Sequence, residues 1–438
     1  MTDTVEAKSD EAPERDGPRP DPTEERGAGS SPLRLAMVIA GTVAIGVLGS
    51  FTTLAVVGAL IFMIFMHELG HYLTAKWAGM KVTEFFIGFG PRLWSFRKGE
   101  TEYGLKLIPA GAYVRIIGMS NLEEVPPEDE DRTYRQKSYP RRLSVAVAGS
   151  TMHFLMAIAL MFGLLVLSGE PAPADSDRWA VGAITAGSPA DQAGLELGDR
   201  VASVDGERFA GFPALSEHLR ERPGDEVDLT VLRDGQPVQL QATLADEHPS
   251  TGEQVGFLGI GPTYDLVKLN PLLGAVEAVE RTGTTMWQSV TALGSFFSPS
   301  GISGYFDTIS SSAGGGDEAV APGGDPAADP DANRLLSPVG AVRIASQAAD
   351  VGLASVVFLL FIINVFVGVF NLVPLLPLDG GHVVIATYER LRSRGGKRHF
   401  ADVSKLVPLT IGVIGILVLV GVSALYLDIA DPAANPFQ

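Results

Sequence analysis

The sequence predicts a polytopic α-helical membrane protein with four core transmembrane helices, a membrane-associated β-hairpin and one inserted extracytoplasmic α+β domain. The apolar residues of the 438-residue chain are gathered in four blocks, and about 20 apolar residues suffice to span a bilayer as a helix. The loops after the first and third blocks are rich in Lys and Arg, which favours a cytosolic position for both. The long stretch between the second and third blocks has short alternating segments and turn residues, which are typical of a soluble domain.

Composition excludes several classes of function. The chain has 33 basic and 51 acidic residues and a formal net charge of -18. Because no basic stripe with interleaved aromatic residues is present, we expect no nucleic-acid partner. The chain has no Cys, so disulfides and thiolate zinc sites are excluded. Any zinc ion must therefore be held by His and carboxylate side chains.

The N-terminal region combines a polar tail with the first apolar block. Residues 1–33 are rich in Pro, Gly and acidic residues, which predicts an acidic disordered tail. We expect no signal peptide, because the apolar run starts late and lacks a small-residue cleavage pattern. Residues 34–75 hold the N-terminal transmembrane segment. Its apolar run from Leu35 to Met66 forms either one long helix or two helices broken near Gly49, and we favour a fifth, short helix at the N-terminus.

The first block ends in the motif His67-Glu68-Leu69-Gly70-His71. On a helix, two His four residues apart project from one face, so both imidazoles can reach one zinc ion. Glu68 lies beside that metal position and can accept a proton from water there. The alternative is a pair of helix histidines without a metal. The motif therefore predicts a hydrolytic zinc site at the end of a membrane helix.

Residues 76–142 form a basic loop that we expect in the cytosol. Within it, Phe85–Trp94 and Glu102–Ile117 are predicted strands, with a turn at Gly99-Glu100. Apolar alternation beside a zinc motif favours a hairpin that dips toward the membrane, and the alternative is a small cytosolic sheet.

The second block predicts a transmembrane helix over residues 143–168. Small residues at its start allow close helix approach. His153 is an ionisable group inside this span, and such groups are usually functional. It is a candidate for contact with substrate, and two other roles stay open: a hydrogen bond to a neighbouring helix, or zinc ligation.

Residues 179–262 predict a soluble domain of short strands and two helices. A strand is expected at Val181–Ile184, a short helix follows a Ser188 cap, and a second, amphipathic helix is expected at Pro213–Glu221. Two further strands flank Asp234-Gly235, a hairpin signal. This order and the run S-P-A-x-x-A-G-L-x-x-G-D, which starts at Ser188, resemble a bacterial PDZ domain. The resemblance implies that peptide ends bind by strand addition; the alternative is that the domain only blocks access to the membrane site.

The remaining chain is predicted to return to the membrane. Residues 263–297 are mildly amphipathic and are expected to lie along the membrane surface, and the Gly- and Ser-rich residues 298–337 predict a flexible linker. Residues 351–381 predict a transmembrane helix that ends near Asp379. Residues 382–406 predict a basic cytosolic loop, 407–427 the last transmembrane helix, and 428–438 a tail outside the cell.

Asp379 completes a candidate metal site. A carboxylate at the end of an apolar helix needs a partner, and a metal is the best one. Prolines break the helix just before Asp379, and Gly380-Gly381 permits a turn after it. Since basic loops follow both segments, the two histidines and Asp379 lie at the same cytosolic end. Two His and one carboxylate leave an open position for water, which is the catalytic arrangement of zinc.

These motifs together resemble the site-2 proteases, which are intramembrane zinc metalloproteases. The resemblance rests on His67–His71, on Gly88-Phe89-Gly90-Pro91, on the single PDZ-like domain, and on the N-x-x-P-x-x-P-x-D-G-G run that starts at Asn371. The Gly99–Gly104 run is similar to actinobacterial members that act in regulated intramembrane proteolysis.

The resemblance implies one Zn²⁺ per chain, with ligands His67, His71 and Asp379 and with Glu68 as the catalytic base. It also implies that His153, Asn371 and Gly111 contact substrate. One residue departs from the family pattern: His153 stands where the family commonly has Asn in a Gly-Pro-x-x-Asn motif, and the chain reads Gly-Ser-Thr-Met-His from Gly149.

The function predicted from the resemblance is cleavage of transmembrane segments in single-span membrane proteins, such as anti-sigma factors or signal-peptide remnants. The expected location is the bacterial plasma membrane, as a multi-pass protein in contact with lipid, with the active site toward the cytosol and the PDZ-like domain outside. Two alternatives belong to other classes: a membrane scaffold that has lost activity and binds peptide ends, and a zinc-dependent transporter.

Overall fold

The computed structural model describes residues 51–119, 123–249, 252–314, 337–393 and 399–430. Four predicted features lie wholly or mostly outside these ranges: the acidic tail, the break near Gly49, the linker and the C-terminal tail. The first three residues of that tail, 428–430, are described and continue the last helix. Within the described ranges, four helices are long and apolar enough to cross a membrane: Thr53–Trp77, Ala148–Ser168, Leu353–Asn371 and Val403–Ala430. The four predicted core spans are therefore present in the fold.

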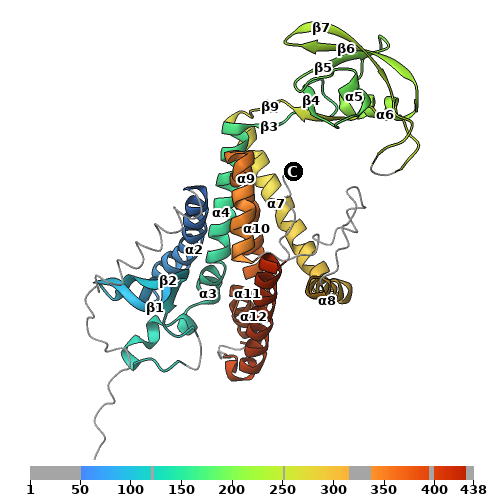
Figure 1. Ribbon diagram of the computed structural model, residues 1–438. Helices are drawn as coiled ribbons and strands as arrows, with labels where there is room; N and C mark the ends of the chain where they lie inside the picture. The colour runs from blue at the N-terminus through green and yellow to red at the C-terminus, as the bar shows by residue number, and fades with distance from the viewer. Residues whose placement is uncertain (1–50, 120–122, 250–251, 315–336, 394–398, 431–438) are drawn as a thin grey trace, which may run out of the picture.

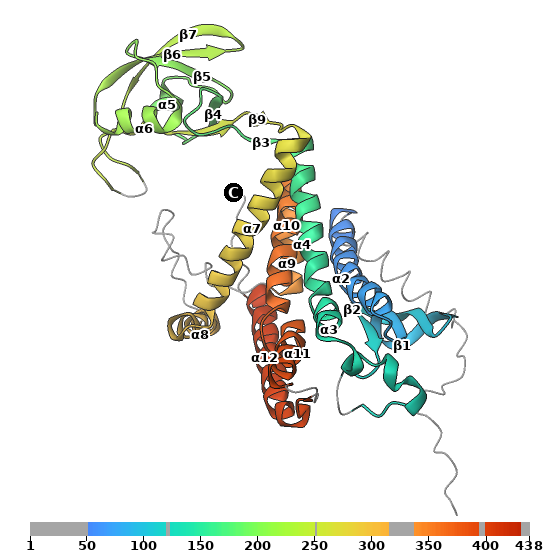
Figure 2. The ribbon, with the colours of Figure 1, turned by 180° about the vertical axis from the view of Figure 1, so that it is seen from behind.

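Two of the other three spans pack on helix α4 (Ala148–Gly163, continued by a π-helical turn to Ser168), which lies between them (Figures 1 and 2). These two spans are α2 (Phe51–Trp77) and α10 (Leu353–Asn371). Small residues allow this approach. A Cβ at Gly368 of α10 would lie 2.7 Å from the Phe154 ring of α4, so only glycine lets these two helices come so close.

Helix α7 (Pro271–Phe296) corrects one prediction. The amphipathic segment 263–297 was expected along the membrane surface, yet α7 packs on α4 and α10 and then diverges obliquely from them toward helix α8 (Pro299–Gly314) (Figure 2). Gly274, Ala278 and Thr282 are buried on one face, and Ala278 joins a core cluster with Met161 and Phe361. This small-residue stripe at a spacing of four lets α7 approach the spans closely.

The region predicted as a linker is also partly helical. Helix α8 (Pro299–Gly314) begins inside it, and Tyr305 of α8 hydrogen-bonds Ser423 of α12 (Val407–Ala430) at 2.8 Å. Helix α9 (Pro338–Val351) follows, with the Ser337 side chain as its N-cap. The Gly and Ser content suggested a linker, but tertiary packing against α12 stabilises α8 as a helix.

The segment that carries Asp379 differs from the prediction as well. Helix α10 ends at Asn371, and Asp379 begins a separate helix, α11 (Asp379–Arg392), which occupies much of the predicted basic loop. Gly380 and Gly381 therefore lie in the first turn of α11 instead of forming a turn after Asp379. The preceding residues fold back over this turn, and a Cβ at Gly381 would lie 2.7 Å from the Leu376 nitrogen.

The predicted hairpin is present, with a first strand that is longer than predicted and a second that is shifted by one residue. Strand β1 (Val82–Lys98) pairs antiparallel with β2 (Thr101–Ile116), and Gly99-Glu100 makes the turn. Lys76, at the end of α2, donates to the Glu100 carboxylate at 2.6 Å. Hydrogen bonds from Arg132 and Lys76 hold the pKa of Glu100 below its usual range. The hairpin is thus fastened to the helix that carries the zinc motif. Short helices connect it to the bundle: Pro127–Arg132, Tyr134–Gln136 and α3 (Tyr139–Ala146).

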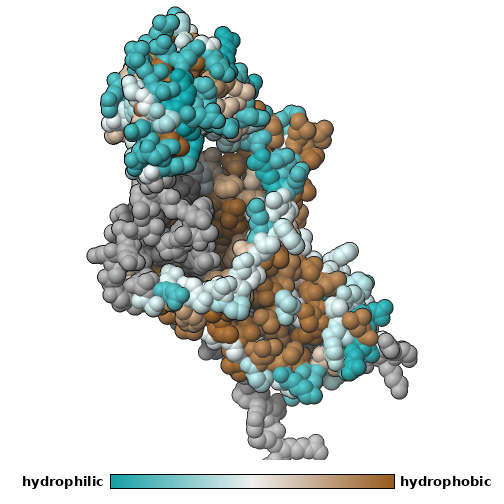
Figure 3. Space-filling view, turned by 90° about the vertical axis from the view of Figure 1, so that its right-hand side faces the viewer, coloured by the Kyte–Doolittle hydropathy of each residue, from teal (hydrophilic) through white to brown (hydrophobic). Residues whose placement is uncertain are grey.

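The inserted module has its own apolar core and lies at the end of the bundle opposite the hairpin and α11 (Figure 1). Its surface is hydrophilic, whereas the bundle below presents broad apolar surface (Figure 3). Its first sheet pairs β4 (Trp179–Ile184) with β8 (Ile260–Tyr264). Its second sheet has the strand order β5 (Arg200–Val204), β6 (Glu226–Arg233) and β7 (Gln236–Thr243). The two helices are α5 (Pro189–Gln192) and α6 (Phe212–Arg220).

A two-stranded stem joins the module to the bundle. Strand β3 (Glu170–Pro171) leaves α4 and pairs with β9 (Leu266–Val267), which leads into α7. Arg281 of α7 forms an ion pair with Glu170 of β3. The remaining short helix, Val403–Leu406, precedes α12.

Candidate metal centre

The structure brings His67, His71 and Asp379 together although they lie on α2 and α11. The Nε2 atoms of His67 and His71 are 3.2 Å apart. Asp379 Oδ2 lies 3.4 Å from His67 Nε2 and 3.3 Å from His71 Nε2. This is the one group of His, Asp and Glu side chains in the described ranges whose ligand atoms converge within 4.8 Å.

The three atoms fit a zinc ion. Zinc binds His nitrogen and carboxylate oxygen at about 2.0–2.2 Å with tetrahedral geometry. The edges of such a tetrahedron are about 3.3 Å long, which matches all three distances between the ligand atoms. Three protein ligands at a tetrahedral zinc ion leave the fourth coordination position open.

Hydrogen bonding directs lone pairs toward the centre of this triangle. His71 Nδ1 lies 2.8 Å from the carbonyl oxygen of Val145 and donates to it, which leaves Nε2 unprotonated in the neutral ring. The buried Asp379 Oδ2 finds no hydrogen-bond donor among the described residues. With His71 neutral, its Nε2 lone pair faces the Asp379 carboxylate oxygen at 3.3 Å, an arrangement that a cation between the two atoms would satisfy.

Glu68 lies next to this cluster on α2. Its carboxylate is within electrostatic range of His71 and Asp379, and it lies against the backbone of Val114 in β2. A carboxylate here can accept a proton from water at the open position. The hairpin therefore forms part of the wall around the candidate base.

His153 reaches the site from α4. Its ring centroid is 5.2 Å from that of His67, and the side chain is 2% exposed. His153 Nδ1 lies 3.0 Å from Asn364 Oδ1 of α10. Asn364 Nδ2 donates to the Leu360 carbonyl, so its Oδ1 accepts from His153. The hydrogen bond to a neighbouring helix, one of the three roles left open by the sequence, is therefore formed.

Two other predicted site residues lie outside the cluster. Asn371 ends α10, before the segment that turns back toward Asp379. Gly111 lies in β2, where a Cβ would come 2.5 Å from the Phe89 ring. The glycine lets Phe89 pack across the hairpin.

Three contacts near the cluster were not predicted. The Val145 carbonyl orients His71, Gly149 makes room for the His67 ring, and Asn364 holds His153. An amide inside an apolar span is a signal that the sequence does contain, because polar groups in membrane helices are rare and usually paired. A backbone carbonyl has no signal in the sequence.

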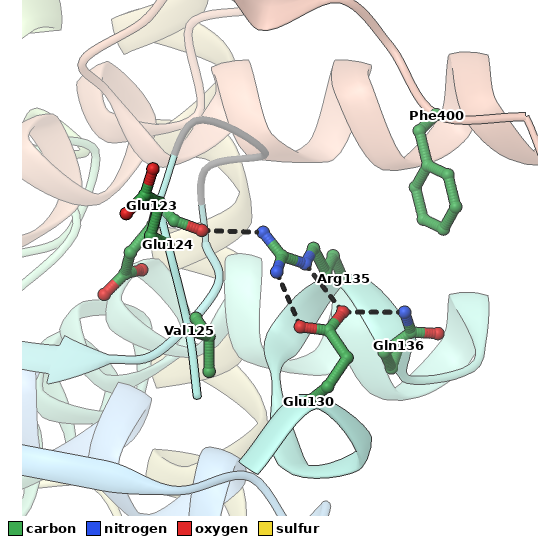
Figure 4. Close-up of a pocket in the computed structure, with 7 residues that line it drawn as sticks. All are labelled: Glu123, Glu124, Val125, Glu130, Arg135, Gln136 and Phe400. Atoms are coloured by element: carbon green, nitrogen blue, oxygen red, sulfur yellow. Dashed lines mark hydrogen bonds and ion pairs between the residues drawn. The ribbon is translucent and has the colours of Figure 1, made fainter. Parts of the chain in front are cut away.

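A hollow of about 800 Å³ in the loop region has a different character (Figure 4). Its polar side chains bind one another: Arg135 donates to Glu130 at 2.6 and 2.9 Å, and Gln136 donates to the same carboxylate. These hydrogen bonds lower the pKa of Glu130 to about 2. None of the predicted site residues lines this hollow, and its charged groups stabilise the loop.

Similarity to known proteins agrees with this geometry. The sequence profile described as peptidase family M50 matches residues 55–320 and 326–415. The chain belongs to peptidase family M50. It is 30% identical to the zinc metalloprotease Rip1 of Mycolicibacterium smegmatis over 85% of this chain and 96% of that protein. It is also 30% identical to Rip1 of Mycobacterium tuberculosis over 87% of this chain and 96% of that protein.

Family membership confirms the predicted class, a zinc-dependent metalloprotease of the site-2 family. The M50 chain also aligns with the PDZ domain of the SdrC-like protein from Listeria monocytogenes. That alignment covers 20% of this chain and 88% of that one at 19% identity and a TM-score of 0.18, a likeness too weak to support an argument.

Proposed function

We propose that this protein is an intramembrane zinc endopeptidase that cleaves transmembrane segments of single-span membrane proteins in regulated intramembrane proteolysis. The observation that carries the proposal is the triangle of ligand atoms, with edges of 3.2, 3.3 and 3.4 Å, among membrane-spanning helices. Anti-sigma factors and signal-peptide remnants are the substrate classes that the family resemblance implies.

In this proposal His67, His71 and Asp379 hold the zinc ion. Zinc, when bound, supplies a Lewis acid that acidifies water and polarises a peptide carbonyl. The Val145 carbonyl keeps the proton of His71 on Nδ1, so that Nε2 stays available as a ligand.

Glu68 is the proposed general base. It accepts a proton from the attacking water and can return it to the nitrogen of the leaving peptide. Its position between the metal cluster and the backbone of β2 supports this role. His153 is proposed to keep one wall of the site in place through Asn364, and contact of His153, Asn371 or Gly111 with substrate remains part of the proposal.

Cleavage of a membrane-spanning helix requires its carbonyls to leave their helical hydrogen bonds. The hairpin supports this step, because β1 and β2 form a two-stranded sheet. Each strand has one edge that pairs with no other described strand. An unwound substrate segment can add to such an edge.

The module of residues 179–262 is proposed to be a PDZ domain that captures peptide ends outside the cell, with the metal centre toward the cytosol. One edge of β8 pairs with β4, and no described strand pairs with its other edge. A pocket of about 600 Å³ beside α6, lined by Phe212, Ser216 and Val255 among others, supports peptide binding. The separation of the module from the basic loops supports this sidedness (Figure 1).

The decisive experiment uses Glu68→Gln in purified full-length protein with a single-span substrate. We expect one zinc per chain, as in the wild type, and loss of cleavage by at least about 100-fold. Glu280→Gln on the exposed face of α7 is the matched control and should keep both zinc and cleavage.

The proposal fails if the wild type binds no zinc or if Glu68→Gln still cleaves at the wild-type rate. A wild type that binds zinc and peptide ends but cleaves no membrane substrate would instead identify the scaffold alternative.

A further inference from the structure

The proposed metal centre is assembled from two separate helices. Two of its ligands lie on α2, and Asp379 is the first residue of α11, more than 300 positions later in the chain. The short helix α3 packs against both α2 and α11. The position of Asp379 relative to the two histidines therefore depends on how α3 is attached to each of these helices.

On one side, α3 is bonded directly to a ligand. The Val145 carbonyl near its C-terminal end accepts from His71 Nδ1 at 2.8 Å. Val145 is completely buried and belongs to a core cluster with Ala75 of α2 and with Tyr134. This end of α3 is thus fixed to the helix of the zinc motif.

On the other side, α3 is joined to α11 by a buried ion pair. Arg142 Nη1 donates to Glu389 Oε2 at 2.6 Å, and the two side chains are 10% and 4% exposed. Glu389 Oε1 also accepts from the Ala401 backbone at 2.7 Å. One turn away, Tyr139 and Thr387 approach at 3.3 Å between their hydroxyl oxygens.

The Arg142–Glu389 ion pair restricts the position of Asp379, because Glu389 and Asp379 lie on the same helix. Glu389 lies ten residues after Asp379 on one continuous helix, a distance of about 15 Å along the axis. A helix held at that distance from its ligand can neither slide nor tilt freely. The Arg142 guanidinium also lies 5.0 Å above the Tyr134 ring, so its own position is fixed.

We propose that α3 is a bridging helix that sets the position of Asp379 against His67 and His71, with Arg142 and Glu389 as its positioning residues. The inference rests on the proposed zinc centre. Neither residue touches the reacting atoms. Removing one partner leaves a buried charge unpaired, and the first structural consequence is loosening of α11.

The test compares Arg142→Met with Arg142→Lys and with a matched control, Arg135→Met. Arg135 also forms a carboxylate pair, with Glu130 in the neighbouring loop (Figure 4), but that pair does not involve α11. Two quantities are measured on purified full-length protein: the rate of zinc release to a chelator, and amide hydrogen exchange in residues 379–392 after zinc has been removed.

We expect Arg142→Met to release zinc about 10- to 100-fold faster, the range typical of residues that orient metal ligands. Exchange in α11 should also rise, while Arg135→Met should leave both quantities at wild-type values. Arg142→Lys keeps the charge but loses the planar guanidinium over the Tyr134 ring, so its rate of zinc release should lie between those of Arg142→Met and the wild type.

Unchanged zinc release and unchanged exchange in Arg142→Met would overturn the proposal. Equal effects of Arg142→Met and Arg135→Met would overturn it as well, because they would indicate general destabilisation. If the wild type binds no zinc, the zinc centre itself fails, yet faster exchange confined to α11 in Arg142→Met would still support the link between α3 and α11.

Discussion

The membrane bundle and the inserted module use charged and polar groups in opposite ways. In the bundle, polar side chains are enclosed: Asn364 is fully buried, and Arg142 and Glu389 are nearly so. In the module, most ion pairs lie toward solvent, as between Arg220 and Glu253, which are 45% and 54% exposed, and Asp199 is the buried exception among the described pairs. The core of the module consists of apolar side chains from its two sheets and α6.

This difference follows from the solvent around each part. Water already solvates the surface charges of the module, so exposed pairs contribute little and apolar burial stabilises the fold. Lipid tails are as apolar as the side chains of the spans, so burying apolar surface between helices gains little free energy. Close packing of small residues and paired polar groups therefore determine how the spans pack together. Polar changes should therefore act on the metal centre in the bundle, and apolar changes on the folding of the module.

The largest expected effect is that of Gly149→Ala in α4. The new Cβ would lie 2.5 Å from His67 Nε2, so the imidazole must leave its place. We expect zinc affinity to fall about 10- to 100-fold and cleavage to fall by about 100-fold or more. Metal content and cleavage of a membrane substrate measure these changes. Gly163→Ala in the same helix is the control, since nothing lies within 4 Å of its new Cβ, and equal behaviour of the two variants would contradict the prediction.

In the module, the largest effect should come from Leu229→Ala on β6. Leu229 is 1% exposed, whereas Leu232 on the same strand is 36% exposed. We expect Leu229→Ala to lower the free energy of unfolding of the module by about 2–5 kcal/mol. Leu232→Ala should change it by less than about 1 kcal/mol. Pulse proteolysis of the full chain measures both changes in stability. A loss of bound zinc in Leu229→Ala would contradict the view that apolar changes in the module do not affect the metal centre.

A smaller effect is expected in the bundle for Asn364→Leu. The change leaves the buried Nδ1 of His153 without its acceptor at 3.0 Å, which destabilises the protein by about 1–3 kcal/mol. The double variant His153→Leu/Asn364→Leu should recover most of this loss, because no unpaired polar group remains. Thermal unfolding in detergent compares the variants. A double variant less stable than Asn364→Leu alone would assign His153 a structural role that does not depend on Asn364.

The smallest effect concerns the pH dependence of the module. Hydrogen bonds from Arg233, at 2.8 and 2.9 Å, hold the pKa of Asp199 below its usual range. A depressed folded pKa means that the stabilisation is present above about pH 4, the unfolded value, and is lost as pH falls through the folded pKa. Arg233→Met should lower the stability of the module at neutral pH and flatten the acid limb of the unfolding curve. Arg200→Met is the control and should change stability by less than about 0.5 kcal/mol.

The sequence predicts the local parts of this structure better than the packing. The spans, the hairpin turn at Gly99-Glu100 and the strands around Asp234-Gly235 follow from hydropathy, periodicity and turn residues. The gathering of His67, His71 and Asp379 was also expected, because membrane sidedness gives three distant residues a common depth. Their chemical roles stay predictions until metal and cleavage are measured.

Predictions that depended on composition alone were wrong where tertiary contacts decide. Helix α8 contains Gly and Ser residues typical of a linker, but Tyr305 binds α12. Helix α7 has the polarity of a surface helix, but its small residues face the spans. The turn expected after Asp379 is the start of α11, because the residues before it fold over the two glycines. In each case one chain segment is shaped by another that is remote in sequence.

The two-stranded stem makes the module topologically independent of the bundle. The chain leaves the bundle at Glu170 and returns at Val267, and these two residues are paired neighbours. The chain between Glu170 and Val267 is therefore an insertion whose two ends lie next to each other. A short turn across that point would leave the path of every span unchanged, so the module could be removed without rerouting the bundle.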